Sequence, residues 1–215
     1  MRIGIAGTGT MARVLGAQWV RAGHAVLVGG RDADLAAALA QRIGARAGTL
    51  RDAARHGEDA VLLAVPYAAA VEVASVLADV LPGRTLIDCT NPVAPGFVLA
   101  TGGGPSAAER IAAAAPGARV VKGFNLCHES VWGLTPPVFD GRPLAVPLCG
   151  DDAAALATVR QLVRDLGCLP VNGGGLDRAG LLEATAALLI GLWVGEGADA
   201  QAIAPPLAYS GIGPV

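Results

Sequence analysis

Short apolar runs alternate with helical patterns along the first 120 residues. Residues 2–6 form a strand-like run, and apolar side chains then recur at helical spacing from Met11 to Trp19. The alternation continues with predicted strands at 25–28, 59–65, 85–88 and 120–122 and predicted helices at 35–43, 68–81 and 105–115. Strands that are apolar throughout are typical of a parallel sheet covered on both faces. The pattern therefore predicts a doubly wound α/β fold.

The second half of the chain departs from this rhythm. It begins with a loop rich in Pro and Gly, and its predicted elements are a loop at 125–143, a strand at 144–149, a helix that starts at Asp151 or Asp152, and a strand at 169–171. A last helix, from about Asp177 to Val194, is apolar nearly all round, so we expect it to be buried against the first lobe or a second subunit. We therefore predict two units, one at 1–126 and a small, mainly helical C-terminal lobe at 127–215 for substrate binding and dimerisation.

The charge balance and the cysteines argue against several classes of partner. Sixteen basic and eighteen acidic side chains give a formal net charge of −2, which offers no broad basic surface for nucleic acid. The apolar runs are interrupted by Pro, Gly or charge, so no membrane span is expected. The four cysteines lie far apart without a C-x-x-C pair, and no metal site is expected. Glycines interrupt the N-terminal run where a signal peptide would stay apolar, which predicts a cytoplasmic protein.

A glycine-rich turn opens the first predicted helix. The segment Gly7-Thr8-Gly9-Thr10-Met11-Ala12 matches G-x-G-x-x-A directly after the first strand. In such a turn the first glycine permits the sharp bend, the second lets the backbone approach a pyrophosphate, and the helix N-terminus presents free N–H groups to the anion. We expect Gly7, Thr8, Gly9, Thr10 and Met11 to contact the cofactor. The motif in this position predicts that the unit at 1–126 is a Rossmann-type dinucleotide-binding domain.

The end of the second predicted strand indicates which dinucleotide is bound. A site for NAD normally carries Asp or Glu there to accept the ribose hydroxyls, but this strand ends in Gly29-Gly30-Arg31. The guanidinium of Arg31 is suited to the 2′-phosphate of NADP(H). In the alternative reading Arg31 is only solvated and Asp32 binds the ribose, although Asp32 is also placed to cap the next helix. NADP(H) is the favoured cofactor.

Ligands on open α/β sheets lie beyond the carboxyl ends of the strands, so the segments that follow the strands are the next candidates. Val65-Pro66-Tyr67 follows one strand, and we expect its rigid proline and flat aromatic ring to contact the cofactor. Lys122, the only lysine among fifteen arginines, ends another strand, which hints that an ammonium group is needed there. We count it among the cofactor-binding residues, although a codon bias would also deplete lysine.

Two asparagines in the same kind of position are candidates for the reaction itself. Asn91 and Asn125 can give amide hydrogen bonds to a carboxamide or a substrate carbonyl, although turn chemistry would also explain them. We also count Asn91 and Pro92, which follows it, among the cofactor-binding residues. His128 lies just past Asn125, where it could relay a proton to a reduced substrate. The Tyr-x-x-x-Lys pair of short-chain reductases is absent, and a flavin-like ring would need little acid–base help from the protein.

Taken in order, these motifs resemble the coenzyme F420-dependent NADP reductase family, whose nucleotide fold also occurs in the reductase domain of the STEAP metalloreductases. Besides the segments above, the resemblance rests on Leu148-Cys149-Gly150-Asp151-Asp152 and on Gly175-Leu176-Asp177-Arg178-Ala179 with Leu181-Leu182-Glu183. It implies hydride transfer between NADPH and a deazaflavin (F420) or flavin in a cleft between two lobes, in a homodimer. The alternatives are an NADPH-dependent reductase of a small carbonyl or imine metabolite and a non-catalytic NADPH-binding protein.

Overall fold

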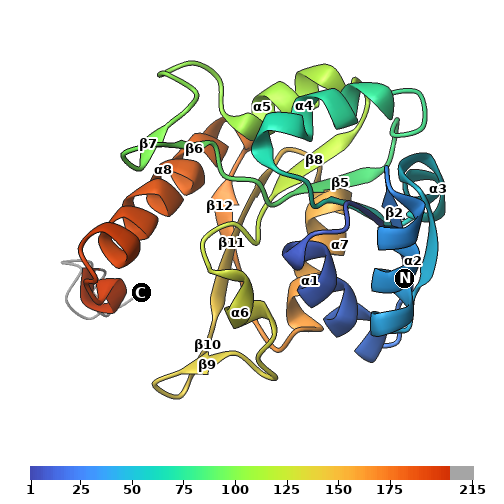
Figure 1. The fold of residues 1–215 in the computed structure, drawn as a ribbon. Coiled ribbons are helices and arrows are strands. Elements are labelled where there is room, and N and C mark those ends of the chain that lie inside the picture. The colour runs from blue at the N-terminus through green and yellow to red at the C-terminus, as the bar shows by residue number, and fades with distance from the viewer. Residues whose placement is uncertain (204–215) are drawn as a thin grey trace.

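An eight-stranded sheet runs through the computed structural model, which describes residues 1–203 (Figure 1). The strand order is β12-β11-β8-β5-β4-β1-β2-β3. The strands are β1 (Arg2–Ala6), β2 (Ala25–Gly30), β3 (Arg46–Thr49), β4 (Ala60–Leu63), β5 (Thr85–Asp88), β8 (Arg119–Lys122), β11 (Ala145–Gly150) and β12 (Leu169–Gly174). Neighbouring strands are parallel except β8 and β11, which are antiparallel. The order reverses between β1 and β4, as in a doubly wound sheet, and this confirms the predicted fold class.

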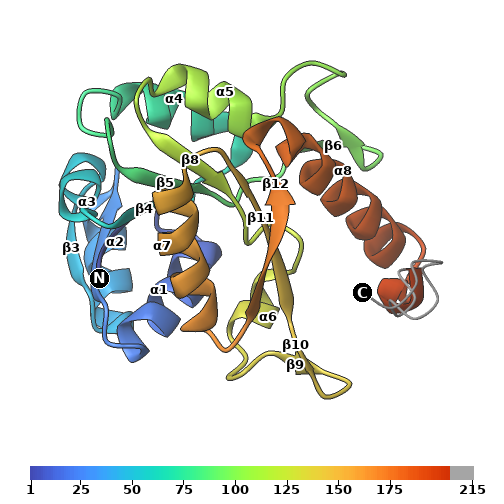
Figure 2. The same ribbon diagram turned by 180° about the vertical axis from the view of Figure 1, so that it is seen from behind.

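Helices cover both faces of the sheet (Figures 1 and 2). They are α1 (Thr10–Arg21), α2 (Ala33–Ile43), α3 (Leu50–His56), α4 (Tyr67–Val76), α5 (Ala107–Ala114), α6 (Glu129–Trp132), α7 (Ala153–Arg164) and α8 (Ala179–Ile190). Because side chains alternate along a strand, β4 sends Leu62 into the apolar cluster under α1, α2 and α7 and sends Val61 and Leu63 into the cluster under α4 and α5. A strand buried on both faces must be apolar throughout, which is why the sequence pattern was informative here.

Strand β3 and helix α3 were not predicted. They lie between the predicted helix at 35–43 and the predicted strand at 59–65. As the edge of the sheet, β3 is largely exposed, and its sequence Arg-Ala-Gly-Thr carries no apolar run. Helix α3 buries only Ala53, Ala54 and His56, so its periodicity is weak, but Thr49 and Asp52 form a capping box that fixes its start.

The second half of the chain extends the same sheet. The predicted strands at 144–149 and 169–171 correspond to β11 and β12, with α7 between them. The loop at 125–143 contains α6 and a small hairpin, and the segment after β5 forms a second hairpin of β6 (Val93–Ala94) and β7 (Val98–Leu99). The boundary between 1–126 and 127–215 stays a prediction, and the part of the second unit beyond residue 203 lies outside the described residues.

Helix α8 is buried on one side and exposed on the other in the described structure. A short 3-10 turn (Leu176–Arg178) precedes it and a π-helical turn (Gly191–Gly195) follows it. It runs away from the sheet beside the β6–β7 hairpin (Figure 2), and Leu181, Leu188 and Val194 are 56%, 56% and 71% exposed. By length and composition alone, Leu176–Gly195 would suffice to cross a membrane, although Asp177, Arg178 and Glu183 interrupt its apolar run. The rest of the described chain buries one side of α8 and leaves the apolar side chains on its other side exposed.

Candidate functional site

Gly7 and Gly9, the two glycines of the turn before α1, differ in the space around them. Gly7 has φ = 134°, its N–H donates to the carbonyl of Gly29 at 2.8 Å, and a Cβ there would lie 2.0 Å from the carbonyl oxygen of Ala64. Gly9 is the N-cap of α1, and a Cβ there would meet no atom within 4 Å. No side chain caps α1, and its first turn has no acidic residue. The turn therefore presents free N–H groups to open space, which fits a pyrophosphate.

A hollow of about 280 Å³ lies beside this turn. Its lining gathers residues that the sequence predicted separately, namely Gly7, Thr8, Gly9, Arg31, Val65 and Pro66. Arg31 is exposed and has no ion-pair partner among residues 1–203. The carboxylate of Asp32 instead caps α2, accepting hydrogen bonds from the N–H groups of Asp34 (2.9 Å) and Leu35 (3.0 Å). The guanidinium of Arg31 is therefore available to a phosphate, whereas the carboxylate of Asp32, the alternative ligand for the ribose, is engaged in capping α2.

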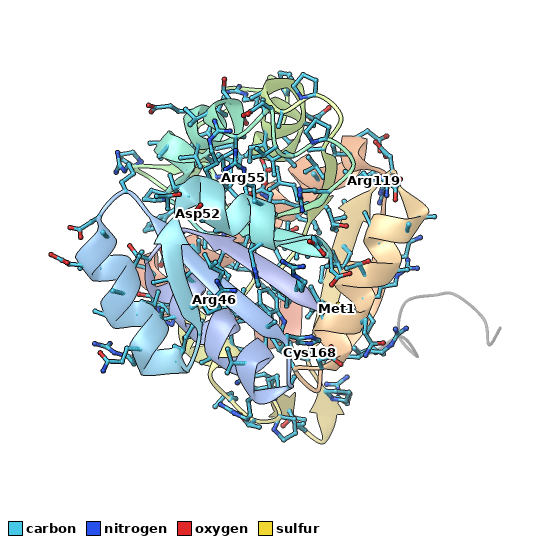
Figure 3. The ribbon with its side chains drawn as sticks, turned by 90° about the vertical axis from the view of Figure 1, so that its right-hand side faces the viewer. Met1, Arg46, Asp52, Arg55, Arg119 and Cys168 are labelled. Atoms are coloured by element: carbon cyan, nitrogen blue, oxygen red, sulfur yellow. The ribbon has the colours of Figure 1, made fainter. Side chains whose placement is uncertain are left out.

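A larger hollow, of about 420 Å³, lies elsewhere, among Arg2, Arg46, Asp52 and Arg55 (Figure 3). Arg2 and Arg46 are the first residues of β1 and β3, so this hollow is at the amino ends of the strands. Parallel α/β sheets bind ligands at the opposite, carboxyl ends. Its arginines also lie near acidic groups, since Arg2 pairs with Glu58 at 2.8 Å. The glycine turn is therefore the better candidate for a dinucleotide site in spite of the difference in volume.

The two candidate asparagines meet at the carboxyl ends of β5 and β8. The side-chain amide of Asn91 donates to the backbone carbonyl of Asn125 at 2.7 Å, and that of Asn125 donates to Oδ1 of Asn91 at 2.9 Å and to the carbonyl of Leu182 at 3.2 Å. Asn125 is 5% exposed, and its Oδ1 has no hydrogen-bond partner in the described structure. A buried acceptor without a donor is costly, so this oxygen is suited to an N–H group of a ligand.

Lys122 does not lie where a cofactor contact would need it. Its side chain is 0% exposed, and Nζ donates to Asp88 Oδ2 at 2.8 Å, Glu183 Oε1 at 2.9 Å and the carbonyl of Thr90 at 2.6 Å. Burial by itself would lower the pKa of Lys122, but the two carboxylates outweigh it and the pKa is raised. An ammonium with all three donors used has none left for a cofactor. The predicted direct contact is therefore corrected to a buried ionic cluster.

The remaining predicted cofactor residues lie around the turn and the hairpin. Thr10 lines a further hollow of about 300 Å³ between α1 and α2, whereas the side chain of Met11 packs against the apolar core. Tyr67 is the first residue of α4, and its hydroxyl accepts a hydrogen bond from Arg110 at 3.3 Å. The carbonyl of Pro92 accepts from the N–H of Ala100 at 2.7 Å, which closes the base of the β6–β7 hairpin.

Within the described residues, the contacts of His128 are local. His128 is the N-cap of α6, with Nδ1 2.9 Å from the hydroxyl of Ser130 and Nε2 3.1 Å from the carboxylate of Glu129. Its side chain is 67% exposed. These contacts explain the residue as a helix cap, and its predicted role as a proton donor stays a prediction.

Sequence reasoning missed the two carboxylates of the buried cluster. Glu183 had a visible signal, because it is the only charged residue in the otherwise apolar run 179–190. A lone charge in such a helix is seldom buried without a partner. Asp88, the last residue of β5, had a weaker signal, because a carboxylate at the end of a strand is common in turns.

Comparisons of sequence and fold relate the chain to known proteins. Residues 2–92 match the model of the family described as NADP oxidoreductase, coenzyme F420-dependent. The F420-dependent NADP reductase of Methanothermobacter marburgensis is 29% identical over 87% of this chain and 90% of its own length. The metalloreductase STEAP3 of Rattus norvegicus is 32% identical over 89% of this chain, which spans only 38% of that relative. A solved structure from Arthrobacter sp. FB24, provisionally described as an F420-dependent NADP reductase, has a TM-score of 0.80 and 28% identity, with 92% of this chain and 95% of that one covered. Over residues 2–92 the chain matches the coenzyme F420-dependent NADP oxidoreductase family, and most of its length is similar to a curated F420-dependent NADP reductase.

Proposed function

We propose that the chain is an NADP-dependent oxidoreductase that transfers hydride between NADP(H) and a deazaflavin or flavin-like acceptor. The observation that carries this proposal is the shared location of two features at the carboxyl ends of the strands. An uncapped helix N-terminus faces open space at Gly9, and a buried, unsatisfied amide oxygen lies at Asn125. The first suits a pyrophosphate and the second suits the carboxamide of a nicotinamide.

Each part of the proposed site has a separate task. The free N–H groups at the start of α1 would hold the pyrophosphate, and Arg31 would pair with the 2′-phosphate. The Oδ1 of Asn125 would accept a hydrogen bond from the carboxamide of the nicotinamide, while Asn91 fixes the orientation of the Asn125 side-chain amide. NADPH, when bound, supplies the hydride from C4 of its nicotinamide. Orientation of the ring is thus the main contribution of these residues to the reaction.

The side chains near the asparagine pair favour an acceptor that needs no acid from the protein. Among the residues that the structure describes, the ammonium of Lys122 has its three donors engaged, and His128 caps α6 at the surface. A ketone reduced to an alcohol needs a proton donor at its oxygen. A flavin or deazaflavin takes the hydride on its ring and a proton from solvent, so it fits these surroundings better.

Stopped-flow absorbance tests the proposal directly. NADPH is mixed with F420, with FMN and with a panel of small carbonyl and imine compounds, and the loss of absorbance at the nicotinamide band is followed. Turnover with F420 or FMN supports the proposal. Turnover with small carbonyls or imines alone would replace it with a metabolite reductase, and tight binding without oxidation by any acceptor would replace it with a nucleotide-binding role.

We also propose that two copies of the chain pair through α8. The exposed side chains of Leu181, Leu188 and Val194 form an apolar surface on a helix whose opposite side is fixed to the sheet. Glu196 and Asp199 follow the helix, and this acidic end does not favour an anionic membrane surface. A second copy would cover the apolar surface. Light scattering coupled to size-exclusion chromatography tests this, and a monomer at micromolar concentration would contradict it.

A further inference from the structure

A cluster of three buried charges joins the C-terminal helix to the sheet. Asp88 on β5, Lys122 on β8 and Glu183 on α8 have side chains that are at most 1% exposed. Each polar side-chain atom of these three residues has a hydrogen-bond or ion-pair partner. Asp88 Oδ1 accepts from the N–H and hydroxyl of Thr90 at 2.8 and 2.7 Å, in addition to the bond from Lys122 to Oδ2. Buried groups bonded in this way are held in one geometry.

Glu183 ties this cluster to a third element. Its Oε2 accepts from the N–H of Ala107 at 3.0 Å and its Oε1 from the N–H of Ala108 at 3.3 Å, both in the first turn of α5. Its carboxylate therefore binds an ammonium and a helix N-terminus at the same time, and both are electrostatically favourable to a negative charge. A movement of α8 along its axis would break these bonds.

The ionic cluster and the asparagine pair share the same three segments of chain. Thr90, whose carbonyl binds Lys122, directly precedes Asn91. Lys122 itself ends β8, three residues before Asn125. Glu183 follows Leu182, whose carbonyl accepts from the amide of Asn125. Each segment that carries a member of the ionic cluster thus also carries a member of the amide network.

We propose that Glu183 is a positioning residue that acts through Lys122. It fixes α8 against the carboxyl ends of β5 and β8, and this holds Asn91 and Asn125 in the alignment that hydride transfer needs. The inference rests on the proposed function for its catalytic consequence, but the alignment itself can be measured without any acceptor.

A role in stability alone would not explain the choice of residues. A buried ion pair often contributes no more stability than apolar side chains of the same volume, because desolvation offsets the attraction. Apolar side chains have no directional bonds, however, and would let α8 slide. A displacement of about 1 Å at a reacting centre can lower a rate up to roughly a hundredfold. Fixed distances are therefore the property that this cluster supplies and an apolar contact would not.

The test compares Glu183→Gln with Glu109→Gln. Both carboxylates bind N–H groups at the start of α5, since Glu109 accepts from the N–H and hydroxyl of Ser106 at 2.8 and 2.7 Å, but Glu109 is not bonded to Lys122. The side-chain amide signals of Asn91 and Asn125 are followed by ¹H–¹⁵N NMR. Calorimetry gives the Kd of NADP⁺, and single-turnover kinetics with C4-deuterated NADPH give the rate of hydride transfer.

We expect Glu183→Gln to shift or broaden both amide signals and to lower the hydride-transfer rate about tenfold, with the Kd changed less than about threefold. Glu109→Gln should leave the amide signals, the Kd and the rate unchanged. The proposal is overturned if the two variants behave alike, or if Glu183→Gln weakens binding as much as it slows transfer. If the wild-type protein reduces no acceptor, the proposed function fails, and the amide signals alone then decide this inference. If Glu183→Gln does not fold, Glu183→Asp is used instead, because it keeps the negative charge on a side chain that is one methylene shorter and so moves it away from Lys122. Amide signals of Asn91 and Asn125 identical to those of the wild type would then overturn the proposal.

Discussion

Gly7→Ala should lower the stability of the protein, whereas Gly9→Ala should weaken cofactor binding, although only one residue separates the two positions. At Gly9 the backbone is extended (φ −79°, ψ −172°), a conformation open to any residue, and the added methyl would meet no protein atom within 4 Å. The gain from a stiffer unfolded chain and the loss of a good N-cap residue are each about 1 kcal/mol or less and nearly cancel. We expect the free energy of unfolding of Gly9→Ala to lie within about 1 kcal/mol of the wild type.

The methyl at Gly9 would instead occupy the space that we assign to the pyrophosphate. Loss of one or two charge-assisted hydrogen bonds from the start of α1 costs about 1.5 to 3 kcal/mol, which corresponds to a roughly 10- to 150-fold rise in the Kd of NADPH. At Gly7 the new Cβ would lie 2.0 Å from the carbonyl oxygen of Ala64, and φ = 134° is strained for any residue with a side chain. Overpacking and backbone strain together should cost of order 3 kcal/mol or more.

Urea denaturation followed by circular dichroism gives the free energy of unfolding, and NADPH fluorescence titration gives the Kd. Gly9→Ala should be as stable as the wild type and bind poorly, whereas Gly7→Ala should be markedly less stable. Full affinity in Gly9→Ala would refute the placement of the pyrophosphate. Wild-type stability in Gly7→Ala would refute the close approach of this turn to Ala64.

Three further outcomes follow from the same structure. Arg31→Ala should raise the Kd of NADPH about 10- to 100-fold and that of NADH less than about threefold, while Arg46→Ala, which removes the same charge at the other end of the sheet, should change neither. Lys122→Met leaves two carboxylates without their cation and should lower the free energy of unfolding by about 3 to 5 kcal/mol in urea titrations at pH 7. The pKa of Lys122 is raised in the folded protein, so the stabilisation that its charge provides is complete below the unfolded-state pKa of about 10.4 and is lost as the pH rises through the folded-state pKa. The free energy of unfolding of the wild type should therefore fall more steeply above about pH 10.4 than that of Lys122→Met. Leu188→Glu should shift the species seen by light scattering to the monomer, and an unchanged mass would exclude α8 as the interface.

The elements that the sequence predicted correctly are those whose neighbours lie nearby in the chain or whose burial is complete. The run Ala60–Leu63 is apolar because both of its faces are covered, and the glycine turn was readable because strand, turn and helix are contiguous. The strand β3 was missed because an edge strand lacks that burial, so its four residues carry no hydrophobic pattern. For α8 the sequence left open whether the first lobe or a second subunit covers the helix, because an apolar pattern shows that a surface needs cover but not which molecule supplies it.

Lys122 shows how a correct chemical signal can lead to a wrong location. Its rarity in an arginine-rich chain indicated that an ammonium was required, but its acceptors come from β5 and from α8, the latter 61 positions away in the sequence, and no local pattern joins them. The structure gives the reason for the choice. Three acceptors converge on Nζ from Asp88, Glu183 and Thr90, which matches the three donors of an ammonium. A planar guanidinium carries five donors, and in a cavity with no exposed surface the two in excess would be left unsatisfied. Arginine is therefore excluded at this one position by hydrogen-bond count, which is why a chain that uses arginine everywhere else retains lysine here.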